Sequence, residues 1–409
     1  MAIPTAPIEI IDADYYQENG YPFHIWDKLR KDAPVAYCEH PNLVPFYAIS
    51  RYEDIVEISR QPTLFESAPL LVVQPPDMAM QQQIRSIINM DLPDHRTYRK
   101  IMSSYFTKKR LNESQPKMDR VAEQILDAVA AKGDEVDFVN EVSKILPLAV
   151  IAEQLGLPVE DRDQFFQWTN EVVGALDPDF AREDGTKGPE LALKAIQEVF
   201  VYCTKFVEDR RKSPQDDLTT VLANAKIDGE YLPPLELLSY IFILIIAGNE
   251  TTRNATSGGM MTLMEHPDQM QYAIKHPEVL DSMVEEMVRW SSPIIHFCRT
   301  PNKDVTLHGV DIKAGEHIAM FYPSANRDET RFDDPYRFDI LRTPNQHLGY
   351  GIGEHLCLGA HLARLELRAI FKGILHRVNH VELIGEPNRL KSSLIGGIKS
   401  LPVKIDFAA

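Results

Sequence analysis

Cysteine is scarce in this chain of 409 residues, and its placement excludes two kinds of stabilising site. Only four cysteines occur, Cys38, Cys203, Cys298 and Cys357, and no CxxC pair is among them. Structural zinc sites need closely spaced ligands, and disulfide-stabilised folds need a denser set of cysteines. The sequence therefore argues against both, and it suits a reducing compartment such as the cytosol.

Long apolar runs and an excess of positive charge are also missing. The longest apolar stretch, residues 240–248, is far shorter than the roughly 18 residues that suggest a membrane span. The N-terminus lacks the basic and apolar regions of a signal peptide. Asp and Glu number 60 against 43 Lys and Arg, a net charge of −17 that disfavours nucleic acid and anionic membranes as partners. No linker or repeat divides residues 1–409, so we expect one soluble, cytoplasmic unit.

Helical periodicity dominates what is present, and it predicts a mainly α fold with small β-sheets. The expected helices cover residues 22–31, 52–60, 116–132, 136–155, 161–176, 189–212, 234–266 and 277–290. Short strand signals lie at residues 46–49, 305–307, 317–321 and 403–407. Two segments, 66–93 and 177–189, are rich in turn residues and predict loops.

The most informative residue is Cys357, because of the loop that leads to it. Gly349, Gly351 and Gly353 precede the cysteine, and a helical pattern begins at Leu358. Glycines allow tight turns and close approach of the backbone to a large flat ligand. The free N–H groups at the start of a helix favour a thiolate, which is a metal ligand or nucleophile. A lone buried structural cysteine is the commoner alternative.

The spacing Tyr350-Gly-x-Gly-x-His355-x-Cys357-x-Gly359 resembles the haem-binding loop of the cytochrome P450 family. The one departure is Tyr350, where the family usually has Phe. The resemblance implies the triangular, prism-like fold of that family, with haem b between a long central helix and the helix after Cys357. It makes Cys357 the axial iron ligand and places Tyr350, His355 and Gly359 at the cofactor.

The central helix carries Ala247-Gly248-Asn249-Glu250-Thr251-Thr252. An acid followed by a hydroxyl residue after an apolar run is unusual inside a helix, because a buried carboxylate needs a partner. Alone, this is most simply a polar turn. Beside the Cys357 loop, it resembles the oxygen-activating stretch of the family, with Glu250 and Thr251 as the catalytic pair and Thr252 as the less favoured hydroxyl. Ala247 is then expected above the haem, and Gly248 is expected to leave room for oxygen.

Two further groups of polar residues gain a meaning from the resemblance. Each is by itself more commonly a solvated charge or a surface ion pair. The resemblance implies that one group binds the haem propionates, through His95, Arg99, Arg299 and His355. It implies that the other is a structural triad of Glu286, Arg289 and Arg337.

The expected substrate pocket has aliphatic walls. Its proposed residues are Ile243, Ile246, Ala247, Pro293, Ile294, Ile295, Leu394 and Ile395. No fixed cation is among them, so we expect a neutral hydrophobic small molecule, with a terpenoid or a steroid favoured. Fatty-acid or aromatic hydroxylation is the alternative within the family.

The resemblance implies a monooxygenase that takes O2 and receives electrons from a ferredoxin, its reductase and NAD(P)H. A basic stripe, Arg364, Arg368 and Lys372, and the cluster Lys108, Lys109 and Arg110 either dock the acidic ferredoxin or are solvated charges. Two other function classes remain open at this point. One is a peroxide-driven or isomerising haem-thiolate enzyme, and the other is a haem sensor without catalysis.

Overall fold

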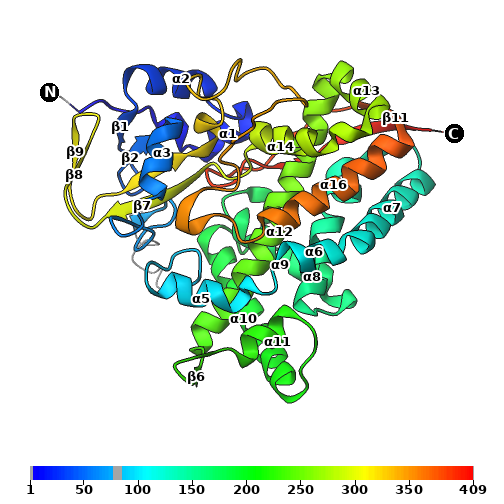
Figure 1. Ribbon diagram of the computed structural model, residues 1–409, viewed down its shortest axis with the longest axis horizontal. Helices are drawn as coiled ribbons and strands as arrows, with labels where there is room; N and C mark the ends of the chain where they lie inside the picture. The colour runs from blue at the N-terminus through cyan, green and yellow to red at the C-terminus, as the bar shows by residue number, and fades with distance from the viewer. Residues whose placement is uncertain (1–2, 77–84, 409) are drawn as a thin grey trace.

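A long central helix, α12 (Pro234–Glu265), runs through the protein, and most other helices pack around it (Figure 1). The computed structural model describes residues 3–76 and 85–408. The other α-helices described are α1 (Ala13–Asn19), α2 (Phe23–Asp32), α3 (Tyr52–Ser59), α5 (Asp94–Ser103), α6 (Lys108–Glu113), α7 (Gln115–Lys132), α8 (Ile145–Leu155), α9 (Arg162–Val173), α10 (Gly188–Lys212), α11 (Leu218–Asn224), α13 (Pro267–Lys275), α14 (Leu280–Ser291), α15 (Tyr322–Ala325) and α16 (Ala360–Arg377). Part of the expected 66–93 loop, residues 77–84, lies outside the described residues.

The β-structure is small and gathers mainly beside the N-terminal segment (Figure 1). The main sheet has the order β1-β2-β10-β7-β3, and only its β10–β2 pair is parallel. Its strands are β1 (Val35–Cys38), β2 (Phe46–Ile49), β3 (Phe65–Glu66), β7 (His296–Pro301) and β10 (Ile318–Phe321). A second sheet joins β11 (Val378–Leu383), β14 (Pro402–Phe407) and β4 (Glu135–Asp137). The two-stranded pairs are β5 (Lys226–Ile227) with β6 (Glu230–Tyr231), β8 (Val305–Leu307) with β9 (Val310–Ile312), and β12 (Asn388–Arg389) with β13 (Ile398–Ser400).

The predicted helix over residues 136–155 is broken near its start. Its first residues form strand β4, a π-helical turn follows at Val139–Ser143, and α8 begins only at Ile145. The Asp137 carboxylate accepts hydrogen bonds from the backbone N–H groups of Val139 (2.9 Å) and Leu401 (3.1 Å). Pairing with the C-terminal strand β14 overrides the local helical pattern, and no local signal reveals that pairing.

Helix α12 contacts α8, α9, α10, α14 and α16, so it is the core element around which the site is built. By length and composition it could cross a membrane, but 50% of its most apolar window is buried inside the protein. Core helices of globular proteins share this property. Pro at the helix start and Pro267 after its end bound the helix.

Gly248 is required by packing between helices. A Cβ built on it would lie 3.0 Å from Cγ1 of Ile151 in α8, a contact tighter than side chains normally make. Glycine inside a helix costs about 1 kcal/mol relative to alanine, and close approach of α8 and α12 explains why it is present. The expectation that Gly248 makes room for oxygen is wrong, because its missing side chain faces Ile151.

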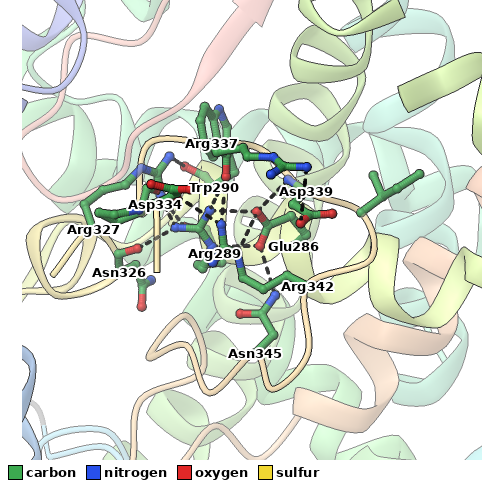
Figure 2. A network of polar contacts seen from close by, with 12 residues as sticks. Glu286, Arg289, Trp290, Asn326, Arg327, Asp334, Arg337, Asp339, Arg342 and Asn345 are labelled. Carbon is green, nitrogen blue, oxygen red and sulfur yellow. Dashed lines mark hydrogen bonds and ion pairs between the residues drawn. The ribbon is translucent and has the colours of Figure 1, made fainter. Parts of the chain in front are cut away.

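A buried ion-pair network joins α14 to the segment after α15 (Figure 2). Arg289 donates from Nε and Nη2 to the two carboxylate oxygens of Glu286 at 2.7 Å each, and both side chains are fully buried. Nη1 of Arg289 donates to the carbonyl oxygens of Asn326 (2.8 Å) and Pro335 (2.9 Å). The pair therefore fixes an irregular stretch of backbone against α14.

Arg342 is the third charged member of this network. Its Nε donates to Glu286 Oε1 at 3.2 Å, and its side chain is 10% exposed. The Arg337 side chain is 64% exposed, and its Nη2 lies 4.0 Å from Oδ2 of Asp339. Only the carbonyl oxygen of Arg337 joins the network, as an acceptor for Arg289 and Arg342. The expectation that Arg337 completes the triad is wrong, because its side chain turns outward (Figure 2).

We expect Arg342→Ala and Arg337→Ala to differ sharply in stability. Removing Arg342 leaves Glu286 short of a buried partner, which should cost about 3 kcal/mol and reduce cofactor retention. Removing Arg337 should change the free energy of unfolding by no more than about 0.5 kcal/mol. Thermal unfolding and haem content of the two purified variants provide the measurement, and equal losses in both would contradict the assignment.

Candidate functional site

The loop before Cys357 is shaped by glycines at positions that other residues cannot occupy. Gly351 and Gly353 have φ of 67° and 77°, in the left-handed region that favours glycine. A Cβ on Gly353 would lie 2.3 Å from the carbonyl oxygen of Ser59, so the loop also approaches α3 closely. The N–H of Cys357 donates to the carbonyl oxygen of Tyr350 at 2.9 Å. These constraints present the cysteine at the entrance to α16.

Cys357 borders a hollow inside the protein. It is exposed, whereas Cys38, Cys203 and Cys298 are buried. Burial by surrounding protein nevertheless raises the pKa of the Cys357 thiol, and the Gly359 N–H only partly opposes that rise. A side chain that is accessible and yet surrounded by protein lies on the wall of an internal space. A thiol there becomes a thiolate when a metal cation provides the compensating charge.

Helix α12 presents its small and aliphatic face to accessible space. Ala247 is exposed, and Ile243, Ile246 and Thr251 are half-buried, although this is the core helix. The spacing of residues 243, 247 and 251 puts them on one face of the helix. Helix α12 packs on α16, whose first turn follows Cys357, so this accessible face and the thiol belong to neighbouring elements (Figure 1).

The acid and the hydroxyl of α12 point in different directions. Thr251 donates from Oγ1 to the carbonyl oxygen of Ala247 at 2.8 Å, so its hydroxyl lies on the accessible face. Glu250 is fully buried and accepts hydrogen bonds from Asn249 and Arg253. Burial raises the pKa of Glu250, and Arg253 only partly offsets that rise. Thr252 is buried as well, so Thr251 is the hydroxyl placed on the hollow.

Four basic side chains converge beside Cys357. The rings of His95 and His355 lie 4.2 Å apart, and Arg99 donates from Nη2 to the carbonyl oxygen of Leu356 at 2.5 Å. Burial, together with the neighbouring Arg299, His95 and Arg99, lowers the pKa of His355 to about 2. Within residues 3–76 and 85–408, neither arginine has an ion-pair partner. An anionic group is what this cluster needs.

Tyr350 and Gly359 lie on either side of Cys357 in the chain and differ in their surroundings. Tyr350 carries a hydroxyl that is buried without a hydrogen-bond partner among the described residues. The Arg364 guanidinium lies 4.2 Å from the centroid of its ring, a distance typical of a cation–π contact. Nothing lies within 4 Å of a Cβ built on Gly359, so that position borders open space. Gly359 therefore leaves room for a flat group beside Cys357.

Two of the segments predicted to form the substrate pocket, residues 293–295 and 394–395, lie side by side. The Ile295 N–H donates to the Leu394 carbonyl oxygen at 2.8 Å, and the Gly396 N–H donates to that of Pro293 at the same distance. Ile294 and Leu394 are half-buried, so they can contact a ligand.

Three residues of the predicted pocket are less accessible than expected. Pro293 is buried, and Ile295 and Ile395 are 0% and 3% exposed. Ile295 packs into the hydrophobic cluster that includes Trp26 and Phe321. In this structure these three residues are buried, so they are not accessible to a ligand. Accessible wall residues are Ile243, Ile246, Ala247, Ile294 and Leu394.

These features define a class of site. A lone accessible thiol, unpaired cations and an open glycine surround a hollow that fits a flat, dianionic metal cofactor, with the thiol as ligand and the cations toward its carboxylates. The family model for cytochrome P450 matches residues 22–400, and the chain belongs to the cytochrome P450 family. Enzymes of this family are monooxygenases that bind haem b, and the residues described here fit that group.

Relatives cover nearly the whole chain. A methyl-branched lipid omega-hydroxylase of Mycobacterium tuberculosis is 35% identical over 98% of this chain and 95% of its own length. A steroid C26-monooxygenase of Mycolicibacterium smegmatis is 38% identical, with coverage of 98% and 94%. The structure of a cytochrome P450 of Mycobacterium marinum in complex with pseudoionone superposes with a TM-score of 0.92 at 30% identity, over 98% and 99% of the two chains.

We expect Cys357→Ser to abolish the red-shifted ferrous–carbonyl Soret band that marks thiolate ligation. The reason is that a serine hydroxyl does not ionise to a comparable metal ligand near neutral pH. Cys203→Ala is the matched control, because Cys203 is buried away from the hollow and should leave the band in place. A persistent band in Cys357→Ser would assign the ligand to another residue.

Proposed function

We propose that this enzyme hydroxylates the end of a methyl-branched hydrocarbon chain on a terpenoid, steroid or related lipid. The observations that carry the proposal are the accessible Cys357 thiol and the accessible aliphatic side chains on one face of the neighbouring helix α12. The overall reaction converts RH, O2, two electrons and two protons into ROH and water. An aliphatic wall favours a neutral apolar substrate through buried carbon area, at about 25 cal/mol per Å².

The names of the relatives support this substrate class. One relative is named for omega-hydroxylation of methyl-branched lipids and another for oxidation of a steroid at C26. The end of a branched alkyl chain is the shared reaction position, because C26 is a terminal carbon of the steroid side chain. Pseudoionone, bound by the Mycobacterium marinum enzyme, is likewise a methyl-branched chain. These likenesses favour a branched chain end over an aromatic ring or a straight fatty acid.

Some of the site residues are proposed to bind the haem, and others are proposed to transfer protons. The haem, when bound, supplies oxygen activation with electrons from a redox partner. Cys357 is its proposed ligand, and His95, Arg99, Arg299 and His355 are its proposed carboxylate contacts. Ala247 is small enough to leave space above the cofactor, and the aliphatic wall excludes water from that space. Thr251 offers a hydroxyl to oxygen, and Glu250 is the proposed acid behind it.

We expect compounds with a branched apolar chain to shift the haem spin state at lower concentration than straight-chain acids of equal carbon number. The aliphatic wall has no cation to hold a carboxylate, whereas it can enclose methyl branches. Spectral titrations with matched compounds measure the ranking, and product analysis should place the hydroxyl on the chain end. Tighter binding of the straight-chain acids, or oxidation elsewhere, would overturn the substrate proposal.

The basic stripe on α16 does not offer free charge to a redox partner. Arg364 pairs with Glu285 through two hydrogen bonds of 2.6 and 2.7 Å. Arg368 pairs with Asp281, and Lys372 pairs with Asp119 at 2.7 Å. Docking of an acidic ferredoxin through this stripe is therefore poorly supported, because its charges are already neutralised.

We propose that Lys108 and Lys109 of α6 serve ferredoxin docking in place of the stripe. Both are exposed and have no ion-pair partner within the described ranges. Helix α6 packs against α16, and the pKa of His361 near the start of α16 is lowered by burial and then by the charge of Lys108. Leu356, in the loop beside Cys357, is 45% exposed and adds an apolar contact near the cofactor.

Charge reversal in Lys108→Glu should lower ferredoxin-supported turnover at low salt by a few-fold, with a smaller loss at high salt. Lys303→Glu, before the β8–β9 hairpin, is the matched control and should not change turnover. Rates are measured with ferredoxin and with dithionite as a small reductant. An equal loss with both reductants would show damage to the fold and would remove α6 from the docking surface.

We also propose that residues 1–409 form one haem-thiolate unit that acts in the cytoplasm. Support comes from the family match over most of the chain and from four cysteines that are all free thiols. The retained Glu250–Thr251 pair favours O2-dependent turnover over a peroxide-driven reaction, because only the former needs protons delivered to oxygen.

A further inference from the structure

The carboxylate of Glu250 faces α9, on the side of α12 away from the hollow. Oε2 of Glu250 accepts from Nη2 of Arg253, one turn along the same helix. Nη1 of Arg253 donates to Asn170 Oδ1 at 2.9 Å, and Asn249 Nδ2 donates to Thr169 Oγ1 at 3.1 Å. Both contacts cross from α12 to α9. The orientation of the acid therefore depends on residues of a different helix.

Two atoms of this cluster are buried without a protein partner. They are Oδ1 of Asn249 and Nε of Arg253. Buried polar atoms of this kind are normally satisfied by ordered water, because leaving them unpaired costs free energy. A cluster that combines a carboxylate, a guanidinium and sites for water has the components of a proton path.

The cluster reaches an open cleft on the far side of α9. The cleft holds about 630 Å³ and is lined by Phe166, Gln167, Asn170, Glu171 and the 179–184 segment. Asn170 belongs to both places, since it lines the cleft and holds Arg253. The Phe166 ring lies 5.7 Å from the Arg253 guanidinium carbon and covers it. From solvent inward, the order is cleft, Asn170, Arg253 and Glu250.

We propose that the protons consumed with O2 enter from this cleft, and that Asn170 is the positioning residue that holds Arg253 and thereby Glu250 along the path. This inference rests on the proposed function, in which Glu250 and Thr251 deliver protons. The Arg253 guanidinium offers only donors and no acceptor, so water carries each proton past it to the carboxylate. Glu250 passes one proton toward Thr251 and regains one from the cleft, and two such cycles provide the two protons that leave in water.

The test compares Asn170→Leu with Gln167→Leu. Leucine has the same branched arrangement of side-chain heavy atoms as asparagine but cannot accept the bond from Arg253, so O2-dependent turnover should fall about tenfold and its solvent isotope effect should rise. Gln167 lines the same cleft but bonds to Glu171, so its variant should match the parent. Peroxide-driven turnover brings its own protons and should be unchanged in both.

Asn170→Asp keeps an acceptor for Arg253, so it is the control that distinguishes loss of this hydrogen bond from misfolding of the leucine variant. It should retain the parent isotope effect and the parent yield of product per NAD(P)H. The inference is overturned if Asn170→Leu retains the parent isotope effect, if Asn170→Asp behaves like the leucine variant, or if peroxide-driven turnover falls equally.

Glu250→Gln separates this inference from the proposed function. A normal isotope effect in Glu250→Gln would remove the acid from the reaction and would overturn the relay as a whole. If the solvent isotope effect is raised in Glu250→Gln but normal in Asn170→Leu, Glu250 remains in the relay and only the entry route beside α9 is rejected.

Discussion

The geometry of the site depends on the buried carboxylate of Glu286. Two arginines and the amide of Asn345 surround it, and the N–H of Asp339 donates to it at 3.0 Å. A charge so far from water is tolerated only when its hydrogen-bonding capacity is filled. Asp339, Asn345 and one of the two arginines belong to a long irregular segment, so their hydrogen bonds to Glu286 hold that segment against α14. That segment leads directly into the Cys357 loop, so the position of the thiol follows from this electrostatic requirement.

Helix α12 separates two different environments. Its Thr251 face borders the apolar hollow, while its Glu250 face is polar and joins α9. Neighbouring residues on a helix differ in direction by about 100°, so adjacent positions 250 and 251 reach opposite environments. An acid placed in the hollow would lack partners, because that wall is aliphatic. Behind the helix it has Arg253.

The arginines beside the hollow are positive, although the chain as a whole carries a negative net charge. The net charge is −17, yet Arg99 and Arg299 stand beside the hollow without acidic partners among the described residues. Such an arrangement is costly unless an anion binds there, which fits the propionates of haem b. On the surface, by contrast, the basic residues of α16 are paired, because acids of α14 and α7 neutralise them.

The sequence by itself determined the features that depend on local spacing. The glycine pattern before Cys357, the 3.6-residue periodicity of α12 and the Glu286–Arg289 spacing are all short-range, and each lies where it was predicted. Only the tertiary structure decided which distant groups meet. In the structure, Arg342 takes the place in the ion-pair network that was predicted for Arg337. Acids pair with the basic residues of α16, and Ile295 is buried in the core. The tertiary structure also brought Asn170 to Arg253, because the packing of α9 on α12 joins residues 83 positions apart.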